Sequence, residues 1–147
     1  MNVTIICCVA SKFKKEAPVA NNNGIKILIV DDHKAIREGL KVILQLEPDF
    51  LIVGEAEDGK QAISLAQAFA PDVIIMDIDL GEMHGIEVTE QILSLQPDIC
   101  VIGFSMHSDQ DLARDMCNAG AKAYLSKNDS PDQLILAIRN CGQSQEK

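Results

Sequence analysis

Five short apolar runs alternate with helix-like stretches from Lys26 onward, and this alternation limits the fold more than any other feature. The runs are unbroken and rich in Ile and Val, as strands are when both faces of a parallel sheet are buried. They cover Ile27–Val30, Leu51–Ala56, Val73–Met76, Ile99–Phe104 and Ala121–Leu125. The pattern predicts a doubly wound α/β sandwich, in which one parallel sheet lies between two layers of helices.

The stretches between these runs repeat apolar residues at helical spacing. The clearest stripes are Ile36–Leu40–Ile43–Leu44, Ala62–Leu65–Ala66–Phe69, Val88–Ile92–Leu95 and Leu134–Ile138–Cys141, and a weaker one includes Leu112, Met116 and Ala119. Asp58 with Gln61 has capping-box spacing, as has Ser130 with Gln133. Pro131 falls at the favoured first position of a helix, and Gly120 is suited to a left-handed helix end.

The composition excludes several classes of function. The 147 residues are 47% hydrophobic, enough for one globular domain with a substantial core. Aromatic residues make up 3%, too few for a site that stacks flavins or bases, and the net charge of −9 argues against nucleic-acid binding by this chain itself. No apolar run approaches the roughly 18–20 residues that cross a bilayer, so we expect a soluble, cytoplasmic protein without a membrane partner.

The cysteines form neither a disulfide framework nor a zinc motif. There are five of them, an odd number without a CxxC pair or a histidine at ligand spacing: Cys7, Cys8, Cys100, Cys117 and Cys141. We expect them to be reduced thiols that act as small core residues.

Residues 1–24 differ from the rest of the chain. An apolar stretch is followed by the basic KFKKE and by the breaker-rich APVANNNG. A signal peptide has its positive charges before the apolar stretch, so we treat residues 1–24 as an extension of unknown role that is flexible at least from Ala17. The folded domain is expected over 25–143, with a short tail at 144–147.

Polar residues whose side chains can bind ligands or react stand at the ends of the predicted strands. The first strand ends in Asp31 and Asp32, the third in Asp77 and the fourth in Ser105, and Lys127 follows the fifth. Each alone could be an ordinary cap or turn residue. In a doubly wound sheet, however, the ligand site lies at the carboxyl ends of the strands, so all five are expected to meet there.

Converging carboxylates repel one another and need a cation. Two unit charges about 4 Å apart cost about 4 kcal/mol at an effective dielectric of about 20. A cluster of carboxylate oxygens suits Mg²⁺, which also coordinates phosphate oxygens. Lys127 can hold a phosphoryl oxygen as a point charge, and the Ser105 hydroxyl can donate a hydrogen bond to the same group. These groups together suit a site at which a carboxylate accepts a phosphoryl group.

Four stretches over residues 26–141 resemble the receiver domain of two-component response regulators: KILIVDDH, PDVIIMDIDLGEMHG, VIGFSMHSD and AGAKAYLSK. The phrase EPDFLIVGEAEDG looks most like the NarL/FixJ branch. The resemblance implies a flavodoxin-like (βα)5 fold with a five-stranded parallel sheet in the order 2-1-3-4-5.

The resemblance also implies site roles. Asp77 would be the phosphoacceptor and Lys127 the active-site lysine, while Ser105 and Tyr124 would form the conformational switch. Asp31, Asp32, Asp77 and the backbone carbonyl of Asp79 would hold Mg²⁺, with Mn²⁺ as a substitute. The positions of Asp79 and His107 would tune the phosphoryl lifetime.

The implied partners are a sensor histidine kinase or a phosphotransfer protein, and a homodimer would use the face made by the fourth helix, fifth strand and fifth helix. The domain would catalyse its own phosphorylation without being a turnover enzyme. NarL/FixJ relatives usually carry a C-terminal helix-turn-helix domain that controls transcription, but the sequence ends at Lys147, so the output cannot be read from it.

The sequence departs from the family pattern at several positions. Gly81 stands where a proline is usual, so the loop there should be less rigid. Asn128 replaces the proline after the active-site lysine, which leaves a cis peptide bond in doubt. Met106 is larger than the residue that many relatives carry beside the switch hydroxyl. Of the three histidines, we place only His107 near the site and expect exposed or capping roles for His33 and His84.

Three other functions stay open. The domain could be a receiver used only for docking. Asp77-Ile-Asp79 also resembles the DxD motif of haloacid-dehalogenase-type phosphatases, although that motif normally opens the domain. A flavodoxin-like flavin carrier would share the fold, but the sequence lacks a phosphate-cradling loop and stacking aromatics. The segment Met83–Gly85 is expected to be a loop in which Gly85 takes a positive φ.

Overall fold

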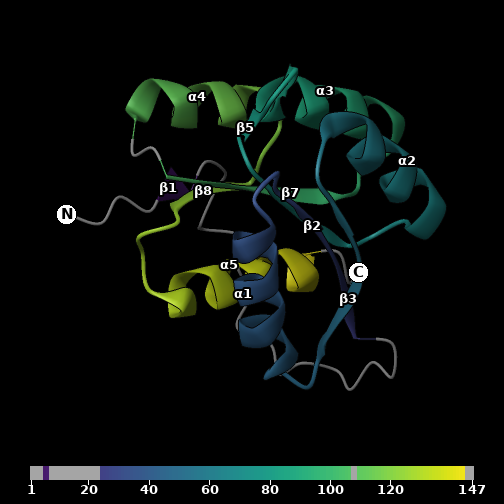
Figure 1. The fold of residues 1–147 in the computed structure, drawn as a ribbon, viewed down its shortest axis with the longest axis vertical. Coiled ribbons are helices and arrows are strands. Elements are labelled where there is room, and N and C mark those ends of the chain that lie inside the picture. Colours follow the sequence, from purple (N-terminus) through teal and green to yellow (C-terminus); the bar gives the residue numbers. More distant parts are fainter. Residues whose placement is uncertain (1–4, 7–23, 107–108, 145–147) are drawn as a thin grey trace.

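The structure is a computed structural model that describes residues 5–6, 24–106 and 109–144 (Figure 1). The described helices are α1 (Lys34–Gln45), α2 (Gly59–Phe69), α3 (Gly85–Leu95), α4 (Gln110–Asn118) and α5 (Pro131–Ser144). The strands are β1 (Ile5–Ile6), β2 (Ile25–Val30), β3 (Phe50–Ala56), β4 (Val73–Met76), β5 (Asp79–Leu80), β6 (Met83–His84), β7 (Cys100–Ser105) and β8 (Ala123–Ser126). No helix in these ranges is long and apolar enough to span a membrane.

The main sheet has the strand order β1-β8-β7-β4-β2-β3. The five strands β3, β2, β4, β7 and β8 are parallel, which confirms the predicted order 2-1-3-4-5. A sixth strand, β1, pairs antiparallel with β8 at the edge of the sheet. This strand lies within the N-terminal extension and was not predicted from the sequence. Most of the segment expected to be flexible, 17–24, lies outside the described residues.

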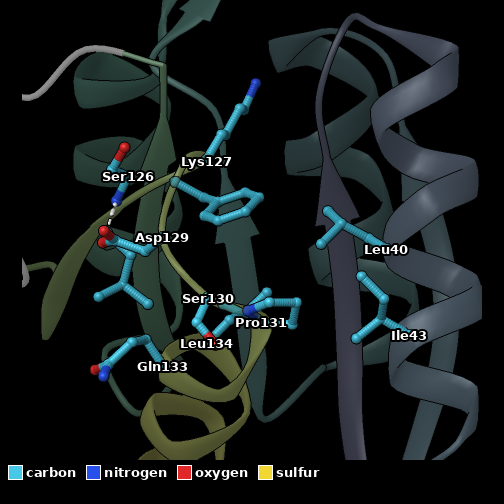
Figure 2. A pocket seen from close by; sticks show the side chains of 11 residues that line it. Leu40, Ile43, Ser126, Lys127, Asp129, Ser130, Pro131, Gln133 and Leu134 are labelled. Carbon is cyan, nitrogen blue, oxygen red and sulfur yellow. Dashed lines mark hydrogen bonds between the residues drawn. The ribbon is translucent and has the colours of Figure 1, made fainter. Parts of the chain in front are cut away.

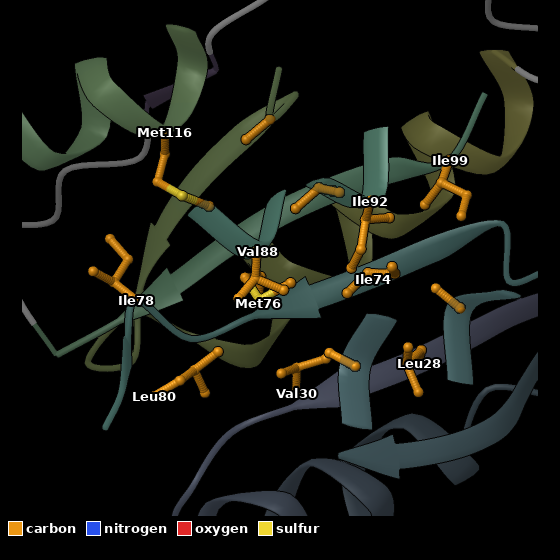
Figure 3. Packing of buried hydrophobic residues seen from close by; sticks show 14 of the residues in the cluster. Leu28, Val30, Ile74, Met76, Ile78, Leu80, Val88, Ile92, Ile99 and Met116 are labelled. Atoms are coloured by element: carbon orange, nitrogen blue, oxygen red, sulfur yellow. The ribbon is translucent and has the colours of Figure 1, made fainter. Parts of the chain in front are cut away.

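Helices cover both faces of the sheet. On one face α2, α3 and α4 pack over the strands, with Val88, Ile92 and Met116 lying against a strand layer that includes Ile74 and Met76 (Figure 3). On the other face α1 and α5 pack through buried apolar residues, as Figure 1 shows from the side. The two faces explain the unbroken apolar runs, because alternate residues of each strand enter different cores.

Local signals set several helix ends as expected. The Asp58 carboxylate accepts a hydrogen bond from the Gln61 backbone at 2.8 Å, and Pro131 begins α5. The Gln61 side chain returns to the Glu57 backbone at 3.0 Å, one residue before the position of an ideal capping box. Gly120, just after α4, has a φ of +114°.

The prediction for Met83–Gly85 was wrong. Met83 and His84 form β6, which pairs with β5 in a small hairpin, and the positive φ falls on Gly81 in the turn between these strands. Gly85 is needed for a different reason: a Cβ atom there would lie 2.1 Å from the carbonyl oxygen of Asp77. The start of α3 therefore packs directly on the backbone of the strand end that carries Asp77.

The prediction of reduced thiols was also wrong for the cysteines of the described core. Cys100, at the start of β7, and Cys141 on α5 form a disulfide with their Cα atoms 5.9 Å apart, and Cys117 on α4 is disulfide-bonded as well. Cys100 and Cys141 are 41 positions apart, and only the packing of α5 on the sheet brings them together, so sequence spacing gave no sign of the pair.

We expect Gly85→Ala to destabilise the fold by several kcal/mol, because the added methyl group meets backbone atoms that cannot move independently. Gly39→Ala on α1 is the matched control, since a Cβ there meets nothing within 4 Å. That change should stabilise the protein by about 0.5–1 kcal/mol. Urea unfolding curves measure both effects, and equal stability of the two variants would contradict the close contact at Gly85.

Candidate functional site

Four strand ends bring the predicted site residues to one edge of the sheet. Asp31 follows β2, Asp77 follows β4, Ser105 ends β7 and Lys127 follows β8. The sheet pairing continues one residue beyond the strands: the Asp77 amide donates to Val30 at 2.9 Å and the Lys127 amide to Ser105 at 2.8 Å. The backbone itself therefore fixes the relative positions of these side chains.

Lys127 joins two of the acids. Its Nζ atom lies 2.6 Å from Asp31 Oδ2 and 3.3 Å from Asp77 Oδ1. All three side chains are at most 4% exposed. A buried carboxylate pair without a cation would be strongly destabilising, so the ammonium group offsets the repulsion that the sequence predicted.

Arg37 on α1 supports this edge and was not identified from the sequence. Its Nη1 donates to the Asp31 carbonyl at 2.6 Å, and its Nε donates to Glu55 on β3 at 2.8 Å. Lys41 also contacts Glu55, at 2.6 Å, and the hydrogen bonds from Lys41 and Arg37 lower the pKa of that carboxyl. Because α1 carries several other charged residues, the sequence does not single out Arg37, and only its burial reveals that it positions the strand end.

His33 lies at the site, contrary to the prediction that only His107 would. Its Nδ1 is 2.9 Å from Asp32 Oδ1 and 3.2 Å from Asp31 Oδ1. The imidazole is 65% exposed and occupies the N-cap position of α1 without a side-chain cap hydrogen bond. The expectation of an exposed residue at a cap position was correct for His33, whereas its contact with the acids was missed. His107 lies outside the described residues.

Asp77 is electrostatically strained. Burial, followed by the negative charge of Asp31, raises its pKa to about 6, although Lys127 acts in the opposite direction. Asp77 Oδ2 is one of the few buried side-chain oxygen or nitrogen atoms of the described part without a hydrogen-bond partner. One carboxylate oxygen thus contacts the lysine, while the other is held ready for a further cation or for bond formation.

The two predicted switch residues are in contact. A hydrogen bond joins the side chains of Ser105 and Tyr124, and burial raises the pKa of the phenol. Tyr124 is 2% exposed, and it packs close to Gly103, where a Cβ atom would lie 2.8 Å from the ring. The aromatic ring is therefore already inside the fold, on the same strand pair that carries Ser105 and Lys127.

The remaining predicted residues lie near the site. Asp32 follows Asp31 and its side chain is 38% exposed. Asp79 is exposed at the start of β5, and Met106, just after Ser105, is 57% exposed. The peptide bond between Lys127 and Asn128 is trans, as are all others in the described ranges.

The residues fit a divalent cation. Asp31, Asp32, His33 and Asp77 form what we call the acidic cluster, in which one ligand atom from each residue lies within 4.8 Å of the others. Three of the four offer carboxylate oxygens, the donors that Mg²⁺ and Mn²⁺ prefer. The partnerless Oδ2 of Asp77 provides an independent reason for a cation there, since a buried carboxylate oxygen without a partner is costly.

A separate hollow of about 80 Å³ lies between α1 and the start of α5 (Figure 2). Leu40 and Ile43 lie on one side of it and Leu134 on the other, and Lys127 stands at its margin. None of the acidic cluster lines it, so this hollow and the strand-end site are different features.

Comparisons with known proteins agree with this fold and this site. The family pattern of the response regulator receiver domain matches residues 27–139. Among curated proteins, the transcriptional regulatory protein DegU of Brevibacillus brevis is 40% identical over 123 residues, which cover 84% of this chain and 52% of DegU. LiaR of Bacillus subtilis is 37% identical, over 84% of this chain and 58% of LiaR. The chain spans about half the length of these relatives.

Solved structures agree in fold. A LuxR-family response regulator from Aurantimonas superposes with a TM-score of 0.76 at 33% identity, covering 79% of this chain and 83% of that one. The receiver domain of the putative regulator NarL from Mycobacterium tuberculosis gives a TM-score of 0.78 at 28% identity, covering 82% and 98%. The strand order, the buried Asp31–Lys127–Asp77 contacts and these matches agree with one another. The chain belongs to the response regulator receiver domain family.

Proposed function

We propose that Asp77 accepts a phosphoryl group and that the resulting aspartyl phosphate switches the domain. The observation that carries this proposal is the asymmetric environment of the Asp77 carboxylate. One oxygen contacts the ammonium group of Lys127, while the other is buried and without a hydrogen-bond partner among the described residues. An oxygen of this kind suits a nucleophile better than a purely structural ion pair.

In the proposed reaction a carboxylate oxygen of Asp77 forms a bond to phosphorus while the bond from phosphorus to the donor atom breaks. The electron pair of that bond leaves with the donor. Lys127 neutralises charge on the phosphoryl oxygens, and the Ser105 hydroxyl donates a hydrogen bond to one of them. Mg²⁺ or Mn²⁺, held by Asp31, Asp32, Asp77 and the Asp79 carbonyl, would stabilise the same charge. The domain supplies these groups itself, and it is not a turnover enzyme.

The donor in this proposal is a sensor histidine kinase or a phosphotransfer protein in the cytoplasm. Asp79 and His107 adjust how long the phosphoryl group persists. Ser105 and Tyr124 transmit its presence, since a hydrogen bond joins their side chains across the neighbouring strands β7 and β8. The affected face, made by α4, β8 and α5, is where a homodimer would form. Because the matched curated relatives are named transcriptional regulators, control of transcription is the proposed output, through a DNA-binding part beyond this domain.

Acetyl phosphate with Mg²⁺ should add one phosphoryl group to the wild type and none to Asp77→Asn, as intact-mass spectrometry can show. Glu82→Gln is the matched control, since it removes an exposed carboxylate from the nearby β5–β6 turn but leaves the proposed nucleophile, and it should still gain the adduct. A wild type that binds beryllofluoride but gains no adduct would contradict phosphoryl transfer and favour a docking module. Rapid turnover of the donor would favour a phosphatase.

Mg²⁺ should raise the melting temperature of the wild type, because it binds the folded site and relieves charge repulsion there. Asp31→Asn combined with Asp32→Asn should largely remove this response. Glu90→Gln combined with Asp115→Asn removes two exposed helix carboxylates and should leave it intact. The measurement is thermal unfolding against Mg²⁺ concentration. An undiminished response of the Asp31/Asp32 variant would place the metal elsewhere.

In a chelating buffer, Asp77→Asn should be more stable than the wild type at pH 7. Because the pKa of Asp77 is raised to about 6 in the folded protein, its ionisation destabilises the fold. The wild type has its full stability below about pH 4, and loses the contribution of protonated Asp77 as the pH rises through about 6. The difference is at most about 3 kcal/mol, because the variant also loses the contact with Lys127. Urea unfolding between pH 4 and 7 measures it, and a gap that widens toward low pH would contradict the assignment.

A further inference from the structure

Cys117 is disulfide-bonded, and the cysteine count leaves its partner in the N-terminal segment. The chain has five cysteines, and Cys100 is paired with Cys141. Because Cys117 is in a second disulfide, its partner is Cys7 or Cys8, and the other of these two stays a thiol. Both positions follow β1 directly. A covalent bond therefore joins the chain just after β1 to α4.

The strand pairing agrees with this assignment. β1 runs antiparallel to β8, with Ile6 opposite Ala123, and Figure 1 shows β1 beside β8. The chain that leaves Ile6 is therefore directed toward the start of β8. Only residues 119–122 separate the start of β8 from the end of α4, where Cys117 lies. The register and the cysteine count thus lead to the same end of the β8 edge.

The two disulfides differ in their access to solvent. Cys100 is 3% exposed and Cys141 is 5% exposed, and both belong to the apolar core between the sheet and the helices α1 and α5. Cys117 is partly exposed on α4. Thiol–disulfide exchange needs a thiolate to reach one of the two sulfur atoms, so a reductant attacks an exposed disulfide more readily than a buried one. The Cys117 disulfide is therefore expected to open first.

The bond holds a strand that is too short to hold itself. Two paired residues make few hydrogen bonds to offset the entropy of fixing the chain. A disulfide between positions more than a hundred residues apart removes much of that chain freedom. The strand that β1 covers reads Ala-Tyr-Leu-Ser, with neither charge nor proline to protect the edge. The covering of this edge therefore depends on the Cys117 disulfide.

We propose that the Cys117 disulfide is a redox-sensitive tether: when oxidised it holds β1 over the β8 edge, and when reduced it lets β1 leave that edge and releases α4 from the N-terminal segment. The inference does not depend on phosphoryl transfer to Asp77. It rests on the proposed function only for the location, because a disulfide in the cytoplasm is usually transient and redox-sensing, whereas disulfides in oxidising compartments persist. β8 carries Tyr124, so the tether acts on the strand of a proposed switch residue.

Opening the tether requires a dithiol reductant. One thiolate of the reductant attacks a sulfur atom of the Cys117 disulfide, whose S–S bond breaks while a mixed disulfide forms. The second thiol of the reductant attacks this mixed disulfide and closes the reductant's own S–S bond. Two electrons pass to the chain, and the two thiol protons of the reductant end on the two released sulfur atoms of the chain. A disulfide oxidant reverses these steps.

The first readout is the number of thiols in the full chain during graded reduction with dithiothreitol, a small dithiol. Thiols are trapped by rapid alkylation in urea, counted by intact mass and located by peptide mapping. Two disulfides use four of the five cysteines, so we expect one thiol in the oxidised chain. Three thiols, including Cys117, should appear at low dithiothreitol concentration, and all five only at a higher concentration.

The second readout is hydrogen exchange of the peptide 121–127, which contains β8. Exchange should be several-fold faster in the three-thiol state than in the oxidised chain. Cys117→Ser should exchange fast under both conditions, and Cys7→Ser combined with Cys8→Ser should reproduce this result from the other side of the bond. The matched control is Cys100→Ala combined with Cys141→Ala, which removes only the core disulfide and should keep the redox response.

Circular dichroism establishes that each variant is folded, and phosphoryl uptake on Asp77 is measured on the same samples. Absence of uptake would contradict phosphoryl transfer and leave the tether standing. Exchange of β8 that stays slow after the Cys117 disulfide has opened would overturn the tether, since β1 would then remain in place without it. Opening of the Cys100–Cys141 disulfide first would also overturn it, as would failure of glutathione disulfide to restore the one-thiol state.

Discussion

The ammonium group of Lys127 is the interaction on which the rest of the site depends. It lies 2.6 Å from Asp31 and 3.3 Å from Asp77, and all three side chains are buried. Removing charges from water costs several kcal/mol for each ion, so this arrangement persists only because the surrounding fold fixes it. The cost explains why the pKa of Asp77 stays high despite the lysine. The site is therefore electrostatically incomplete, and a divalent cation or a phosphoryl group would change its balance.

That arrangement in turn depends on backbone pairing at the strand ends. The backbone amides of Asp31, Asp77 and Lys127 donate hydrogen bonds to carbonyl groups of the neighbouring strands. The acceptors are Ala56, Val30 and Ser105, respectively, so a neighbouring strand holds each of these residues. Close packing of α3 adds a further constraint, since the only side chain that fits at Gly85 is a hydrogen atom. Local backbone geometry and charge placement are thus coupled: a change that moves the strand ends also moves the charges.

The convergence of these side chains could be predicted from the sequence because their positions obey a simple rule. Parallel strands end at one edge, so Asp31, Asp77 and Lys127 could be placed together from the apolar runs alone. His33 was misjudged because its contact with Asp32 depends on how the chain turns into α1. Gly85 was misread because its requirement comes from a neighbouring backbone and not from its own φ. Neither effect has a periodic signature.

Strand β1 and the Cys100–Cys141 disulfide were not predicted, for a related reason. A two-residue strand is too short to show alternation, and the register of Ile5 with Tyr124 depends on a partner more than a hundred positions away. Cys100 and Cys141 likewise meet only after α5 has packed on the sheet. Long-range pairings of this kind have no local pattern, whereas the strand-end site follows from elements that are each recognisable in isolation.

Strand β8 links the strand-end site to the edge of the sheet. Its residue Tyr124 hydrogen-bonds Ser105 through the side chain and pairs with β1 through the backbone, so one residue faces both the site and the edge. If phosphoryl transfer to Asp77 alters the Ser105–Tyr124 contact, thermodynamic linkage requires a reciprocal effect: the change that phosphorylation makes to the free energy of β1 pairing equals the change that β1 pairing makes to the free energy of phosphorylation.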